Sequence, residues 1–118
     1  MIIRRRTGKL INLNIPLNKI LDVYVVCKRE FSHLSNEWFF TEPKIWFKYI
    51  TQEKTKGKYH DVVEEKFIKI VDNDQIIIGG STIVIKDPRS IEDDHQRDFY
   101  ITKVTEDLRN TISLEKLS

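Results

Sequence analysis

Aromatic and basic side chains interleave between residues 38 and 49, and these are the residue types in the chain most suited to ligand chemistry. Aromatic rings stack on unpaired nucleic-acid bases, and lysine ammonium groups bind the phosphates that link those bases. On an extended strand Lys44, Trp46 and Lys48 share one face, because successive side chains point to opposite faces. We therefore predict that Trp46 points to solvent between two lysines, while Phe47 points to the core.

Two other tight groups of basic residues extend this hypothesis. The first group consists of Arg4, Arg5, Arg6 and Lys9, and the second of Lys54, Lys56 and Lys58. A bound phosphate chain meets its cations along a path, so we predict that both groups lie on one continuous surface with Lys44 and Lys48. The alternative is that these charges are only solvated surface groups without a ligand.

The charge of the whole chain is nearly balanced, but its two halves differ. The 118 residues carry 20 Lys and Arg against 18 Asp and Glu, a net charge of +2. Residues 1–60 have a net charge of +7 and residues 61–118 a net charge of −5. This asymmetry indicates either a basic face that binds a polyanion or an acidic half that packs against a basic half.

The usual motifs of metal binding and catalysis do not occur in the sequence. The three histidines have no ligand spacing such as i, i+4, and the single cysteine, Cys27, lies in an apolar run where a thiol is usually inert. Gly79-Gly80 is not followed by the lysine of a phosphate-binding loop. We therefore expect a protein that is not an enzyme and that needs no metal or cofactor.

Hydrophobic periodicity in the first half predicts mainly strands. An opening hairpin turns at Thr7-Gly8, and a short helix over 16–22 followed by a strand over 23–30 fits the pattern better than one long helix. Two strands follow and are broken at Pro43. The polar, Lys-rich residues 51–60 then form an exposed loop or the tip of a long hairpin.

The second half predicts more strands and one helix. Residues 62–86 have the pattern of a three-stranded meander with turns at Asp72-Asn73-Asp74 and Gly79-Gly80. A helix is expected within 90–110, with a loosely ordered tail from about residue 111. Together these elements predict a single α+β domain over residues 1–118, a β-rich, partly closed barrel with one or two helices.

The chain resembles the PrgU-type proteins, which are small regulators carried on pheromone-responsive conjugative plasmids of enterococci. The resemblance covers the whole chain, including the opening Met1-Ile2-Ile3-Arg4-Arg5-Arg6 and the segment Trp38-Phe39-Phe40-Thr41-Glu42-Pro43. It implies a PUA-like fold, a pseudo-barrel associated with RNA binding. It also implies a role in restraining expression of the transfer operon and of surface adhesins.

These observations favour a non-enzymatic RNA-binding regulator. The main alternative is a protein-interaction module, or a homodimer, that uses the aromatic segment 38–49, and an enzyme with an unrecognised site is a third possibility.

The longest apolar run, Val23 to Cys27, is too short to cross a membrane, and no signal segment is recognisable. We therefore expect a cytoplasmic protein that is not inserted in a membrane.

Overall fold

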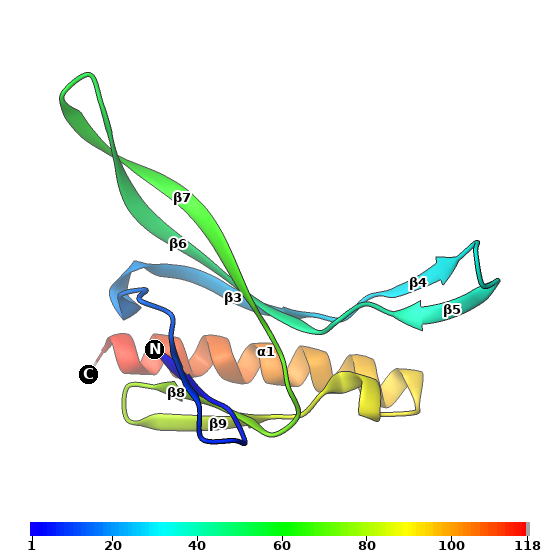
Figure 1. Cartoon of the computed structure of the whole chain (residues 1–118). Coiled ribbons are helices and arrows are strands. Elements are labelled where there is room, and N and C mark those ends of the chain that lie inside the picture. The colour runs from blue at the N-terminus through cyan, green and yellow to red at the C-terminus, as the bar shows by residue number, and fades with distance from the viewer. Residues whose placement is uncertain (118) are drawn as a thin grey trace.

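The computed structural model describes residues 1–117, which adopt an α+β, strand-rich fold with one C-terminal α-helix (Figure 1). The strands are β1 (Ile2–Arg4), β2 (Leu10–Asn12), β3 (Ile20–Val26), β4 (Arg29–Ser32), β5 (Glu37–Phe40), β6 (Lys44–Thr55), β7 (Lys58–Lys69), β8 (Asp74–Ile78) and β9 (Ser81–Ile85). The helices are the short 3-10 helices η1 (Leu17–Lys19) and η2 (Pro88–Ser90) and the α-helix α1 (Asp94–Lys116).

Within the described residues the strands form three sheets that do not close into a barrel. One sheet has the order β2-β1-β8-β9, the second has the order β3-β6-β7, and the hairpin β4-β5 forms the third. Each pairing is antiparallel. The partly closed, PUA-like barrel predicted from the sequence is therefore not confirmed, because the two larger sheets share no hydrogen-bonded strand pair.

Helix α1 lies between β3 and the β8-β9 hairpin, so that the core is enclosed by the two larger sheets and the helix (Figure 1). The core includes Ile3 of β1, Phe47 of β6, Ile76 of β8 and Leu108 of α1, all fully or almost fully buried. Each such side chain contributes about 1.5–3 kcal/mol to folding by leaving water. This core buries one face of β3 and of the first half of β6, while α1 packs along β3.

Helix α1 begins after Asp93, whose carboxylate accepts a hydrogen bond from the backbone N–H of Gln96 and so caps the helix. Val104, Leu108 and Ile112 follow at spacings of four residues and are buried on one face. The prediction of a loosely ordered tail from about residue 111 is wrong, because α1 continues to Lys116. The buried side chain of Ile112 anchors these last turns to the core.

Strands β6 and β7 form a long hairpin whose far end projects from the body (Figure 1). They pair from Lys44–Lys69 to Thr55–Lys58, and the turn consists of Lys56 and Gly57 alone. Both turn residues have positive φ, 54° and 79°, as in a type I′ turn, which matches the twist of the flanking strands. Of the two sequence-based alternatives for 51–60, the hairpin tip is therefore the right one.

The predicted meander over 62–86 is wrong in one pairing and right in the other. The β8-β9 hairpin forms with its turn at Gly79-Gly80, but β7 pairs with β6 and lies in another sheet than β8. Local patterns show where a strand ends, whereas the choice of partner depends on burial against distant elements.

In the first half, the opening hairpin and the two strands broken near Pro43 are confirmed. The helix predicted over 16–22 is limited to the single 3-10 turn η1, and the strand predicted from residue 23 begins at Ile20. The β-branched residues of β3 favour the extended backbone over a longer helix.

Candidate nucleic-acid interface

One aromatic residue from each strand of the β3-β6-β7 sheet lies on the face that points away from the buried core. Tyr24 of β3, Trp46 of β6 and Phe67 of β7 are direct partners in the strand register, so they form a row across the sheet. The neighbouring Ile45 and Phe47 point to the opposite face and are buried. We call Tyr24, Trp46 and Phe67 the aromatic row.

Trp46 and Phe67 contact each other within this row. Their ring centroids are 4.9 Å apart and their planes are inclined by 45°. Phe67 is 43% exposed and Trp46 is half-buried, so both rings present surface to solvent. The sequence-based placement of Trp46 outward and Phe47 inward agrees with this arrangement.

Lys44 and Lys48 flank Trp46 on the same face of β6. The ammonium nitrogen of Lys44 lies 4.5 Å from the centroid of the Phe67 ring, a cation–π contact. Lys48 is exposed and lies opposite Glu65 and Asp22 in the register. A cation therefore stands on each side of the tryptophan. Acidic side chains lie near both cations, Glu65 and Asp22 beside Lys48 and Glu42 near Lys44.

The electrostatics of the row leave Tyr24 as a neutral hydrogen-bond donor. Burial raises the pKa of its phenol, and the charges of Glu65 and Asp22 raise it further. At the edge of the same face Lys69 is paired with Glu42, with 3.0 Å between Nζ and Oε2. The hydrogen bond from Lys69 lowers the pKa of the Glu42 carboxyl, so this lysine is already partly neutralised.

The arginines near the N-terminus lie in the other sheet, and Arg5 has a structural role there. Its guanidinium pairs with the buried carboxylate of Asp74 and donates to the carbonyl of Lys69, 3.0 Å away. Arg4 is exposed and reaches the side chain of Gln75 on β8, and Arg6 is exposed in the turn after β1. Arg5 is thus occupied, while Arg4 lies on the surface formed by β1 and β8 and Arg6 lies in the turn between β1 and β2.

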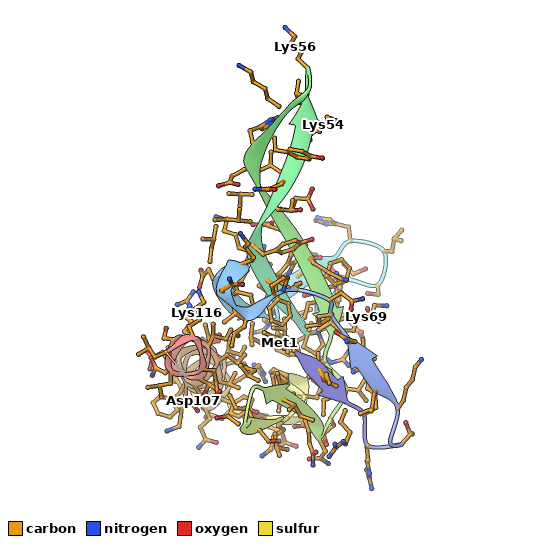
Figure 2. The ribbon with its side chains drawn as sticks, turned by 90° about the vertical axis from the view of Figure 1, so that its left-hand side faces the viewer. Met1, Lys54, Lys56, Lys69, Asp107 and Lys116 are labelled. Atoms are coloured by element: carbon orange, nitrogen blue, oxygen red, sulfur yellow. The ribbon has the colours of Figure 1, made fainter. Side chains whose placement is uncertain are left out.

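The second basic group lies at the far end of the long hairpin. Figure 2 shows Lys54 and Lys56 at the tip and Lys69 at the base. Lys58 starts β7, and Arg5 contacts the residue that ends it, so the two basic groups are separated by eleven residues of strand. At about 3.3 Å per residue this is about 36 Å.

Acidic residues occupy the strand between these two groups, namely Asp61, Glu64 and Glu65. The prediction of one continuous basic surface is therefore wrong. The structure brings Lys44, Trp46 and Lys48 together and leaves Arg4–Arg6 and Lys54–Lys58 at separate ends. Tyr24 and Phe67 were not among the predicted site residues, because only the strand register places them beside Trp46.

Neither a metal centre nor a membrane span is found in the described residues. No group of three or more His, Cys, Asp or Glu side chains within residues 1–117 is arranged to hold a metal ion. None of the helices in this range combines the length and the apolarity that a membrane span requires.

No protein-family model, curated protein or solved structure matches the chain.

Proposed function

We propose that the protein is a non-enzymatic regulator that binds single-stranded RNA on the outer face of the β3-β6-β7 sheet. The observation that supports this most directly is the contacting Trp46–Phe67 pair on a solvent-facing sheet surface, with Lys44 and Lys48 on either side. Unpaired bases stack on such rings, and the phosphates between the bases pair with the lysines. On the opposite face of the sheet Ile45 and Phe47 are buried in the core, and α1 packs along β3, so the rings of the aromatic row remain on the outer face.

The regulatory role rests on the resemblance to PrgU-type proteins, which implies restraint of transfer-operon and surface-adhesin expression. On this proposal RNA binding in the cytoplasm is the means of that restraint. Binding without chemistry is sufficient for such a role, because a protein that occupies a transcript competes with ribosomes or nucleases.

Binding is tested with a fluorescein-labelled, 12-nucleotide single-stranded RNA and fluorescence anisotropy at low salt. Trp46→Ala removes a stacking ring, which is worth about 1–3 kcal/mol, so Kd should rise about 5- to 150-fold. Trp38→Ala on the β5 strand is the matched control and should bind like the wild type. Trp46→Tyr keeps an aromatic ring and should retain most of the affinity.

The far-UV circular dichroism of each variant distinguishes a lost contact from a lost fold. If folded Trp46→Ala binds RNA as tightly as the wild type, or if both tryptophan variants lose affinity equally, the aromatic row is not the binding site.

The β4-β5 hairpin supports a second candidate function, that of a protein-interaction module or homodimer contact. This hairpin projects from the body (Figure 1), and Trp38 at its surface is 60% exposed. Exposed apolar residues on a projecting element are typical of protein interfaces. Such an interface would be largely insensitive to salt and to ribonuclease, whereas binding through RNA phosphates would be sensitive to both.

A further inference from the structure

Half of β6 has a free edge. Strand β3 pairs with β6 only between Lys44 and Tyr49, and no other strand of the described residues pairs with Ile50–Thr55 on that side. An open edge presents unpaired N–H and C=O groups to any extended chain that approaches it. The edge is about 20 Å long, at about 3.4 Å per residue.

The two-residue turn identifies which backbone groups are free. It makes Thr55 and Lys58 a hydrogen-bonded pair, and the pairs then alternate along the hairpin. The N–H and C=O groups of Ile50, Gln52 and Lys54 therefore point away from β7, toward the free edge.

Strand β3 confirms this alternation at the other end of the sheet. The same alternation directs the backbone groups of Val23 and Val25 away from β6, toward α1. There the N–H of Val25 donates to Thr105 Oγ1 at 3.1 Å, and Arg109 Nε donates to the carbonyl of Val23 at 3.0 Å.

A cleft of about 390 Å³ adjoins the free edge. One wall is formed by β6 from Tyr49 to Gln52, and the other by Asn14, Pro16 and Lys19 of the chain that leads into β3. None of the described residues that line this cleft is acidic. Beyond the cleft the free edge carries Glu53, whose side chain points to the opposite face from that of Lys54, and Lys56 follows in the turn. Because Lys19, Lys54 and Lys56 outnumber the single glutamate, the cleft and the edge form a slot with an open backbone and a net positive charge.

We propose that an extended, acidic peptide segment of another protein adds to Ile50–Thr55 as a further strand. Backbone hydrogen bonds to Ile50, Gln52 and Lys54 supply affinity, as in other cases of strand addition, and acidic side chains of the peptide pair with Lys19 and Lys54. The open edge of β7 is a poorer acceptor, because its dense charges of both signs deter pairing.

The first test uses a synthetic fluorescein-labelled ten-residue peptide in which valine and glutamate alternate, and a matched peptide with lysine in place of glutamate. The glutamate peptide should bind at least tenfold more tightly than the lysine peptide in fluorescence anisotropy. On binding, amide hydrogen exchange measured by NMR should slow at Ile50, Gln52 and Lys54. The amides of Thr51 and Glu53, which already bond to β7, should change little.

The second test removes one free N–H from each edge of the hairpin. Gln52→Pro deletes a donor on the β6 edge, and Val63→Pro deletes one on the outer edge of β7, where proline is equally tolerated. Gln52→Pro should weaken peptide binding at least tenfold, and Val63→Pro should leave it unchanged. Both variants are checked for the native NMR fold.

The proposal is overturned if folded Gln52→Pro binds like the wild type, or if the peptide protects none of the three amides. It is also overturned if sedimentation shows a dimer whose amides at these positions are protected without peptide, because a second copy then covers the edge. Trp46→Ala should weaken RNA binding but leave peptide binding unchanged. The experiments therefore distinguish an error in the peptide proposal from an error in the RNA proposal.

Discussion

Arg97 joins the start of α1 to the rest of the fold. Only 5% of the residue is exposed, and its guanidinium donates to Asp94 Oδ1 and to the backbone carbonyls of Ile91 and Glu92. The guanidinium also lies 4.1 Å from the centroid of the Phe40 ring at the end of β5. The two terminal nitrogens of the guanidinium thus have partners, whereas Nε is buried without a partner among the described residues. A buried charge is costly unless it is paired, so the partners of Arg97 matter for stability.

The pairing of Arg97 with Asp94 predicts a stability that depends on pH. The hydrogen bond from Arg97 lowers the pKa of the Asp94 carboxyl below its usual value. The carboxylate therefore stabilises the fold above its unfolded pKa of about 3.9, and this contribution is lost as the pH falls through the lower, folded value. Asp94→Asn should unfold at lower urea concentration than the wild type at pH 7, and the difference should shrink below about pH 4.

Asp107→Asn, on an exposed turn of the same helix, is the control for the loss of a carboxylate. If Asp94→Asn differs from the wild type by the same amount at pH 7 and pH 3, the ion pair does not carry this pH dependence.

At Gly79, in the β8-β9 turn, a side chain is disfavoured both by the backbone conformation and by the nearby side chain of Glu115. Its φ is +58°, and a Cβ at this position would overlap the carboxylate of Glu115, which accepts a hydrogen bond from Ser81. Gly79→Ala should cost about 1 kcal/mol for the backbone conformation plus the cost of displacing Glu115. Gly8→Ala, with φ +91° and no atom close to the new methyl group, should show the first cost alone in thermal unfolding.

The Gly79→Ala change made in a Glu115→Ala background separates the two costs, because it keeps the strain without the clash, and both proteins of that pair lack the Ser81 hydrogen bond. Its destabilisation should be smaller than that of Gly79→Ala in the wild type and close to that of Gly8→Ala. Equal effects in the two backgrounds would mean that Glu115 moves aside freely.

Among the elements, the last turns of α1 differ most from the sequence-based prediction, and a core substitution tests their role. Ile112 is only 4% exposed and belongs to the hydrophobic core. Ile112→Ala should therefore destabilise the protein by about 2–5 kcal/mol in urea unfolding. Leu114→Ala removes a side chain of the same size that is 67% exposed, and it should cost much less. Similar losses for both variants, or a negligible loss at Ile112, would show that these turns do not support the core.

Local sequence signals predicted those features that depend on neighbours in the chain. The opening hairpin, the break at Pro43 and the inward side of Phe47 follow from turn residues and from alternation along a strand. The partner of β7 and the end of α1 depend instead on which distant surfaces they bury. Tyr24 and Phe67 were missed for the same reason, since only the pairing of three strands aligns them with Trp46.

At the scale of the whole molecule, the long hairpin separates charges that the sequence places close together. The principal extents are 53 × 35 × 27 Å, and the hairpin tip carries its lysines away from the body (Figure 2). A count of charges in each half cannot reveal this separation, because it depends on the length of β7 and on the sheet that β1 joins. The compact basic site is therefore the pair of lysines beside Trp46.

The salt dependence of RNA binding distinguishes this compact site from a path along the hairpin. Each phosphate neutralised in a single strand contributes about −0.7 to the slope of log K against log salt concentration. Lys48→Ala should therefore reduce the steepness by about 0.7, because this lysine lies beside the aromatic row. Lys56→Ala, at the hairpin tip, removes the same charge far from the row and should leave the slope unchanged. If Lys56→Ala flattens the slope as much as Lys48→Ala does, the RNA follows the hairpin and the binding surface is larger than the aromatic row.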